Sequence, residues 1–179
     1  MKLINSMGPN PKVVRMFLAE LGMSVDIEEV DLMKAENRGE AYLAKNASGT
    51  TPALELDDGS YLCEIVAICE YLDEISDASS LIGNTAAERA EARMWSRRVD
   101  LNILEPLTNG FRYSEGQAIF KDRMRLIPQA ADDLKALAQE KITWLDGLMK
   151  DKEFVCGSRF TLADVLLFCF LEFGAQVGQ

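Results

Sequence analysis

The pattern of apolar and polar residues over the first 30 positions predicts a strand, a helix and a second strand. Residues 2–4 form a short strand, and apolar residues then recur with helical spacing over 11–21. Asn10 is the predicted N-cap of this helix, and Gly22 stands where a helix commonly stops. The alternation over 25–30 is typical of a strand. The chain therefore begins as β-α-β.

The next 45 or so residues continue the pattern with a polar helix, a hairpin and an apolar helix. Residues 33–45 are predicted to be helical, and the strands 53–56 and 61–62 flank a turn signal at 57–59. Helical spacing returns over 64–74. The first 75 residues thus predict the order βαβαββα.

A change of composition after residue 75 indicates an all-helical second part. Residues 75–85 are rich in Ser, Asp and Gly, as linkers are. Helical patterns follow at 86–114, at about 117–149 and at 162–173. Thr161 and Asp164 stand at the start of the last pattern with the spacing of a capping box.

We therefore predict two domains of the α/β plus all-α class. The first spans 1–78, a linker spans 79–85, and a helical bundle spans 86–179. A length of 179 residues fits two small domains. The charge supports the division, since residues 1–80 carry 6 basic and 15 acidic side chains whereas the remainder carries 13 and 14.

Charge and residue composition exclude several classes of function. The net charge of −10 disfavours a nucleic-acid partner, because phosphates are repelled by it. The chain has no histidine, which removes Ser-His-Asp triads, Cys-His dyads and histidine-ligated metal sites. We expect chemistry based on carboxylates, hydroxyls, thiols, cations or backbone dipoles, without a metal.

The four cysteines indicate a reducing compartment. They include no CxxC pair, and three lie in apolar runs that are typical of small buried side chains. No signal segment is recognised, and the longest apolar run, 165–171, is far shorter than the roughly 20 residues of a membrane span. We expect a cytoplasmic protein with no membrane partner.

Three stretches carry a resemblance to a known family. They are 46–59, which reads NASGTTPALELDDG, 62–72, which reads LCEIVAICEYL, and 161–164, which reads TLAD. Through them the whole chain resembles the glutathione S-transferase family. The resemblance implies a thioredoxin-like first domain, a helical second domain, glutathione as cosubstrate and a homodimer. Family members usually continue with further helix, so the chain is expected to lack the family's last helices.

The resemblance implies a glutathione site around Thr51, Pro52 and Glu64. A proline before this strand of a thioredoxin-like fold is typically cis, which turns the Thr51 backbone outward to clasp an extended peptide. Because the backbone binds, a Thr51→Ala change is expected to matter little. Glu64 is expected to pair with the ligand's α-amine, and Ile65 stands where the family usually has Ser. Candidate donors to the glycine carboxylate are Asn37, Arg38, Lys45 and Thr50.

The family's usual thiol activator, a Tyr, Ser or Cys, has no counterpart here, because Gly8 occupies the Ser/Cys position. Ser6 is a possible substitute, and the amides at the start of the first helix, over 8–12, are expected to stabilise a thiolate. The chain resembles bacterial and fungal members with the same Gly, which activate a water from the helical domain. The candidates for the catalytic set are Ser6, Gly8, Asn10, Thr108 and Arg112.

The electrophile is expected to bind an apolar pocket between the domains. Its candidate lining residues are Met7, Leu107, Phe111 and Tyr113, although aromatic residues at helical spacing are also typical of a core. The leading hypothesis is conjugation of glutathione to a small apolar electrophile. The alternative is a glutathione-binding scaffold or stress protein with little turnover. A redox enzyme is less favoured, because no cysteine lies near Gly8.

Overall fold

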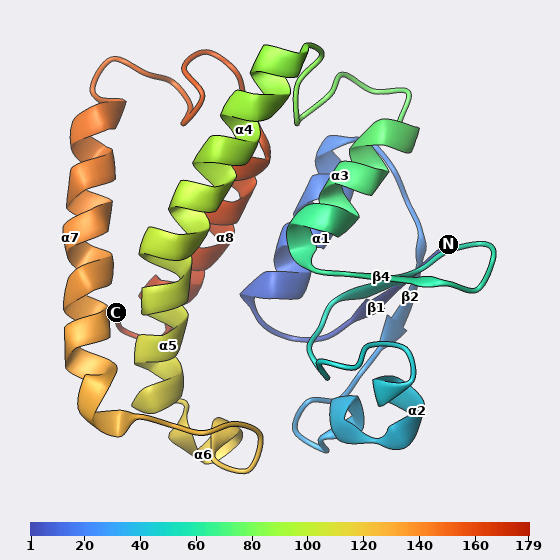
Figure 1. Cartoon of the computed structure of the whole chain (residues 1–179), viewed down its shortest axis with the longest axis vertical. Helices are drawn as coiled ribbons and strands as arrows, with labels where there is room; N and C mark the ends of the chain where they lie inside the picture. The colour runs from blue at the N-terminus through green and yellow to red at the C-terminus, as the bar shows by residue number, and fades with distance from the viewer. The chain divides into compact units, whose positions relative to one another are not determined.

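The computed structural model describes all residues from 1 to 179, and they form two compact units, Met1–Ile82 and Gly83–Gln179. Figure 1 shows a small sheet with helices in the first unit and helices alone in the second. The predicted α/β plus all-α class is confirmed.

The first unit is built on a four-stranded mixed sheet in the order β2-β1-β3-β4. Its strands are β1 (Lys2–Asn5), β2 (Asp26–Glu29), β3 (Ala53–Glu55) and β4 (Tyr61–Cys63). β1 pairs in parallel with β2, whereas the β1–β3 and β3–β4 pairs are antiparallel. Its helices are α1 (Pro9–Glu20), α2 (Glu40–Leu43) and α3 (Ile65–Ile75). The element order is the predicted βαβαββα.

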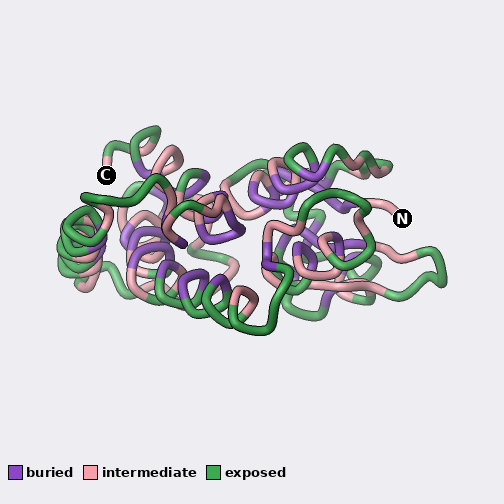
Figure 2. The backbone as a smooth tube through the Cα atoms, turned by 90° about the horizontal axis from the view of Figure 1, so that it is seen from above, coloured by how far each residue is buried: buried purple, intermediate pink, exposed green.

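Both faces of this sheet are covered. Leu3 and Ile4 are neighbours on β1, so their side chains point to opposite faces, and both are fully buried. On one face Ile4 packs with Val30, Tyr42 and Ala53. α1 and α3 pack against each other. In Figure 2 the buried stretches of the tube lie toward the interior of the unit that carries the N-terminus.

α1 ends as predicted but begins differently. Gly22, at a φ of +64°, closes a Schellman motif in which the Met23 amide donates to the Leu18 carbonyl at 2.9 Å. Asn10 is not the N-cap, because the helix already begins at Pro9 and Gly8 caps it. Proline suits a first helical position, since its missing N–H has no helical partner there.

The helix predicted over 33–45 is mostly wrong. Only a 3₁₀ turn, Glu36–Arg38, and the four-residue α2 form there. Ala35 adopts a left-handed φ of +57° and Gly39 is extended, so each interrupts a continuous helix.

The second unit contains two long helical segments and two short ones before its last helix. α4 (Ala86–Val99) continues through a π-helical turn, Asp100–Leu104, into α5 (Glu105–Tyr113), and this segment packs along α7 (Ala131–Met149). α6 (Gln117–Phe120) and a 3₁₀ turn, Pro128–Ala130, lie between α5 and α7, and α8 (Leu162–Gln176) packs against α4.

Pro106 and Pro128 explain where the helical predictions for the second unit agree with the structure and where they differ from it. The pattern over 86–114 is confirmed as near-continuous helix, with the π turn directly before Pro106, which cannot donate a backbone hydrogen bond. The helical pattern predicted at about 117–149 is confirmed over α6 and α7, but the residues between these helices do not continue the helix. The chain leaves helical geometry after α6, and Pro128 starts a new segment.

Capping boxes begin α4 and α8. The Thr85 amide donates to Glu88 Oε2 at 3.0 Å, and the Glu88 amide donates to Thr85 Oγ1 at 3.2 Å. At α8 the Thr161 amide donates to Asp164 Oδ2 at 2.8 Å, which confirms the predicted role of Asp164. Asp164 Oδ1 also accepts from the Val155 amide at 2.8 Å, so this carboxylate ties the preceding loop to the helix.

The cysteines are all free thiols, and all but Cys63 are buried. None of the helices combines the length and apolar character that crossing a membrane requires.

Candidate functional site

A cis peptide bond joins Thr51 to Pro52 immediately before β3, as predicted. The first paired residue of β3 is Ala53, opposite Ile4, so the Thr51 amide and carbonyl lie outside the sheet's hydrogen bonds. A backbone donor and acceptor in this position can pair with an extended peptide in the manner of an added strand.

The residue before Thr51 is held from two sides. The Thr50 carbonyl accepts hydrogen bonds from the Tyr42 hydroxyl and from Asn46 Nδ2, the latter at 2.8 Å. The Thr50 hydroxyl contacts Ser48 Oγ at 2.6 Å. Burial raises the pKa of Tyr42 to about 12, so its hydroxyl stays protonated and able to donate at physiological pH. The loop before the cis bond is therefore rigidly braced.

Ser6 lies on the inner side of Thr51. Its side chain is 2% exposed, and its Oγ lies 2.5 Å from Thr51 Oγ1 and 3.1 Å from the Met7 carbonyl oxygen. The structure thus joins the end of β1 to the cis-proline loop through two hydroxyls.

The candidate donors for a ligand's glycine carboxylate differ in availability. Asn37 is only 4% exposed and donates to the Gly49 carbonyl at 2.6 Å, while its Oδ1 is buried without a partner. Lys45 forms a 3.0 Å ion pair with Glu28. Arg38 is exposed and donates to the Ser48 carbonyl at 3.3 Å, which leaves most of its guanidinium donors open to a ligand.

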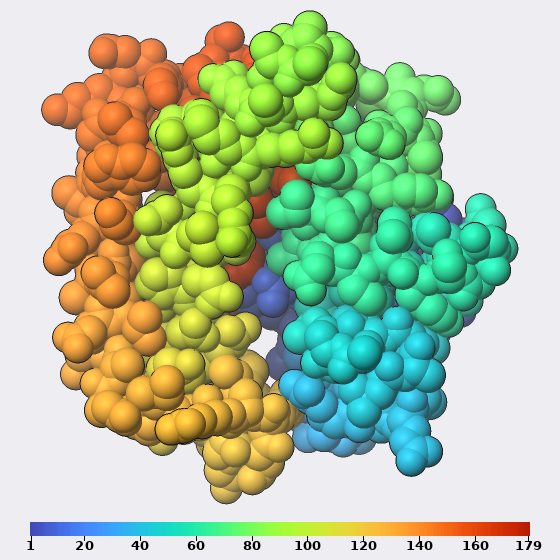
Figure 3. All heavy atoms as spheres, in the orientation of Figure 1, coloured from blue at the N-terminus to red at the C-terminus, as the bar shows by residue number.

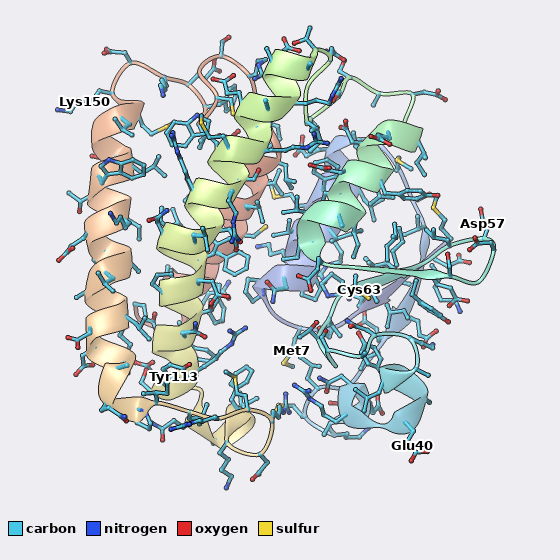
Figure 4. The ribbon with its side chains drawn as sticks, viewed as in Figure 1. Met7, Glu40, Asp57, Cys63, Tyr113 and Lys150 are labelled. Carbon is cyan, nitrogen blue, oxygen red and sulfur yellow. The ribbon has the colours of Figure 1, made fainter.

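Glu64 stands at the start of α3 with an unusual backbone. It is the N-cap residue, it is exposed, and its φ is +71°. The amides of Ile65 and Val66 follow in the first turn, where helical amides lack partners within the helix. Figure 4 shows Cys63 directly before this turn, at the end of β4. Burial, together with the Glu64 charge, raises the pKa of the Cys63 thiol, which therefore stays protonated.

The start of α1 offers fewer amide donors than expected. Gly8 has a φ of +107° and open space where a Cβ would stand. Of the five residues over 8–12, Pro9 and Pro11 have no amide N–H, and the amide of Lys12, the fourth helical residue, is directed at the Gly8 carbonyl inside the helix. Gly8 and Asn10 are left as the outward donors. Met7 precedes them on the exposed loop labelled in Figure 4.

The candidates of the helical unit are occupied within that unit. The Thr108 hydroxyl donates to the Leu104 carbonyl at 2.7 Å, and Arg112 donates to Asn109 Oδ1 at 3.0 Å. Leu107 is buried against Gly174, and the Phe111 ring packs edge-on against Phe173 at 5.1 Å between centroids. Tyr113 ends α5 (Figure 4). Their catalytic and pocket-lining roles stay predictions.

The sequence analysis missed the bracing residues Tyr42 and Asn46. A signal existed for Asn46, because Asn two residues before Ser is typical of a side chain that hydrogen-bonds the backbone ahead of it. No local pattern indicated that the Tyr42 hydroxyl reaches the residue before Thr51.

Models and members of one known family match both parts of the chain. The N-terminal domain model of the glutathione S-transferase family matches residues 8–75, and its C-terminal domain model matches residues 128–173. Glutathione S-transferase 2 of Saccharomyces cerevisiae is 32% identical over 172 residues, which is 95% of this chain and 74% of that protein. Glutathione S-transferase GstA of Escherichia coli O157:H7 is 31% identical over 179 residues, 99% of this chain and 84% of that protein.

Solved structures agree with these sequence matches. A glutathione S-transferase domain-containing protein from Marinobacter aquaeolei VT8 is similar with a TM-score of 0.93 and 33% identity, over 99% of this chain and 88% of that one. Gtt2 from Saccharomyces cerevisiae is similar with a TM-score of 0.92 and 31% identity, over 99% of this chain and 87% of that one.

Proposed function

The chain belongs to the glutathione S-transferase family, and from this premise we propose that it binds glutathione and adds its thiolate to small apolar electrophiles. The observation that carries the proposal is the outward backbone of Thr51 at the cis bond to Pro52, in the same unit as the strained, exposed Glu64. Such conjugation detoxifies electrophiles, and the four free thiols suit a reducing, cytoplasmic setting.

Each end of glutathione has a candidate partner in the first unit. The Thr51 amide and carbonyl pair with the backbone of the ligand's cysteine, and the Glu64 carboxylate pairs with its α-ammonium group. The first-turn amides of Ile65 and Val66 hold the α-carboxylate at the N-terminus of α3. Ile65 adds no hydroxyl to this contact, so the amides act alone.

Arg38 is the proposed partner of the glycine carboxylate. Its guanidinium is exposed and can make a bidentate contact, whereas the Lys45 ammonium is already paired with Glu28. Asn37 donates to the Gly49 carbonyl, and Arg38 donates to the carbonyl of the neighbouring Ser48. Asn37 therefore stabilises the loop that Arg38 contacts.

Thiolate stabilisation is assigned to the start of α1. The amides of Gly8 and Asn10, together with the positive end of the helix dipole, favour an anion there. Gly8 has no side chain and leaves open space, so sulfur can approach its amide closely.

Binding and conjugation are tested together. Calorimetric titration with glutathione is expected to show one site, and the ultraviolet absorbance of bound thiolate is expected to appear below the ordinary thiol pKa. With chlorodinitrobenzene, the thiolate attacks the ring carbon and chloride leaves. Absence of glutathione binding contradicts the proposal.

Variants of two exposed carboxylates sharpen the test. Glu64→Gln is expected to weaken glutathione about tenfold or more, because a charge-assisted hydrogen bond is lost. Glu40→Gln on α2, labelled in Figure 4, removes an equivalent charge from the same unit and is the matched control. Equal affinities of the two variants contradict the placement of the ligand.

A glutathione-binding protein with little turnover is the second candidate. It is favoured by Gly8, which offers no hydroxyl or thiol as activator, and by the two prolines that reduce the amide donors of α1. Tight binding with an ordinary thiol pKa and without chloride release supports this candidate over conjugation.

A homodimer is also proposed, through an apolar stripe on α7. Leu137, Trp144 and Leu148 lie on one face of this helix, and each is between 41% and 46% exposed. In Figure 3 the side chains of α7, in orange, stand at the outer edge of the helical unit. A second copy of the chain would cover this stripe with its own.

A further inference from the structure

The contact between Ser6 and Thr51 joins two buried hydroxyls that are 45 positions apart in the chain. Ser6 is 2% exposed and Thr51 is buried as well, and their oxygens lie 2.5 Å apart. Ser6 Oγ is also 3.1 Å from the Met7 carbonyl oxygen.

The number of protons decides which way these hydrogen bonds run. Each hydroxyl has one proton, and the Met7 carbonyl has none to give. Both contacts are satisfied only when Ser6 donates to Met7 and Thr51 donates to Ser6. The only hydroxyl proton of Ser6 is then donated to the Met7 carbonyl. Because a thiolate is stabilised by hydrogen-bond donors, Ser6 has no proton left with which to stabilise one.

Ser6 is itself held firmly at the end of β1. Arg15 Nη1 donates to the Ser6 carbonyl at 3.3 Å and also to Asn5 Oδ1, while Asn5 Nδ2 donates to Glu29 Oε1 at 2.6 Å. This network joins β1, α1 and β2. The Ser6 hydroxyl is therefore a fixed point from which the Thr51 side chain can be oriented.

Hydrogen bonds thus hold Thr51 both at the preceding residue and at its own side chain. Tyr42 and Asn46 hold the carbonyl of the preceding residue, and Ser6 holds the Thr51 side chain itself. If either set of hydrogen bonds is lost, Thr51 can rotate. Its amide and carbonyl then face the ligand in a smaller fraction of the protein molecules.

We propose that Ser6 is a positioning residue, which holds the Thr51 side chain so that the Thr51 amide and carbonyl face the ligand, and that it does not activate the thiol. The proposal rests on the proposed glutathione site. It also changes the expectation for Thr51, whose side chain now matters to binding although only its backbone touches the ligand.

Two variants and two ligands test this role. Ser6→Ala and Thr51→Val each remove the hydroxyl contact from one side, and the double variant removes it from both. Affinities are measured by calorimetry for glutathione and for S-methylglutathione, which has no ionisable thiol. The pKa of the bound thiol is read from thiolate absorbance, and thermal unfolding of each variant reports whether it folds.

We expect each single variant to lower the affinity for both ligands by the same factor. The factor is about threefold to tenfold, which corresponds to the loss of one hydrogen bond. The double variant is expected to lose no more than either single one, because the contact is shared. The pKa of the bound thiol is expected to stay at its parent value in all three. Should Ser6→Ala fail to fold, Thr51→Val carries the test alone.

The contrary outcomes are distinct. A raised thiol pKa in Ser6→Ala with unchanged S-methylglutathione affinity makes Ser6 the activator and overturns the proposal. Unchanged affinities in both single variants overturn it too, while leaving the glutathione site intact. Failure of the parent chain to bind either ligand overturns the proposed function, and this inference with it.

Discussion

Glu64 is held in a backbone conformation that residues with a side chain rarely adopt. Its φ of +71° costs the fold on the order of 1–3 kcal/mol, and glycine would begin α3 without that cost. Strain of this kind is typical of residues that serve a ligand. At the proposed site, the ligand of the Glu64 carboxylate is the ammonium group of glutathione.

Glu64→Gly is therefore expected to stabilise the fold while weakening ligand binding. Relief of strain outweighs the added freedom of the unfolded chain, for a gain of about 1 kcal/mol in the free energy of unfolding. Urea denaturation measures the gain, and calorimetry measures the affinity for glutathione. Glu64→Gln keeps the strain, so its stability should match the parent's; a more stable Glu64→Gln variant contradicts the explanation.

Glu115 makes the stability of the helical unit depend on pH. Partial burial acts to raise its pKa, but hydrogen bonds from Lys135 and Ser114 outweigh it, and the pKa falls from 4.5 to about 2. A lowered pKa contributes stability that is fully present above pH 4.5 and is lost as the pH falls toward 2. The 2.6 Å pair with Lys135 is exposed to solvent, which limits its contribution.

Removing the charge of Glu115 should show this pH dependence directly. Glu115→Gln is expected to lower the free energy of unfolding at neutral pH by less than about 1 kcal/mol, the usual scale of an exposed ion pair. Denaturant unfolding of parent and variant from pH 7 to pH 2 should show the difference shrinking below pH 4.5. A difference that is constant over this range contradicts the assigned pKa.

At the candidate site, sequence patterns pick out the residues that belong to a local motif and miss the contacts that only folding brings together. Thr51, Pro52 and Glu64 stand in continuous stretches of recognisable order. The contact of Ser6 with Thr51 spans 45 positions, and no local pattern encodes it. The loss of two amide donors at Pro9 and Pro11 was readable from the residues themselves, once the helix start is placed correctly.

Helix boundaries were predicted best where a cap or a single apolar face defines them. Gly22 and the box at Thr161 are short-range signals, and both hold in the structure. The box at Thr85 has the same spacing and could have been read equally well. The polar segments 33–45 and 117–127 have no sustained buried face, so helical propensity alone did not decide their structure.

The two capping boxes should differ in energetic weight. Asp164→Ala removes acceptors from the Thr161 and Val155 amides and is expected to lower the free energy of unfolding by about 2 kcal/mol. Glu88→Ala is the control, because the box at Thr85 is exposed, and about 0.5 kcal/mol is expected there. Chemical denaturation measures both; equal losses contradict the added role of Asp164 in holding the loop.

For the molecule as a whole, the α7 stripe predicts self-association. Trp144→Glu is expected to raise the dimer dissociation constant about thirtyfold, since a central aromatic contributes about 2 kcal/mol at an interface. Leu137→Glu should act in the same direction. Thr143→Glu places the same charge on an exposed part of α7 away from the stripe and should leave the dimer intact. Sedimentation velocity reports the outcome, and a monomeric parent chain contradicts the proposed dimer.

The pairing of β1 with β3 gives the first unit a further property. Lys2 on β1 lies opposite Glu55 on β3. These strands are far apart in the sequence, so they can pair only when the long segment between them closes into a loop. The surface that presents Thr51 does not exist in the unfolded chain, so at the proposed site glutathione binds only the folded chain. Ligand at a hundred times its dissociation constant then adds about 2.7 kcal/mol to the stability of the fold. The melting temperature becomes a reporter of occupancy, by which libraries of glutathione conjugates can be ranked without any knowledge of the natural electrophile.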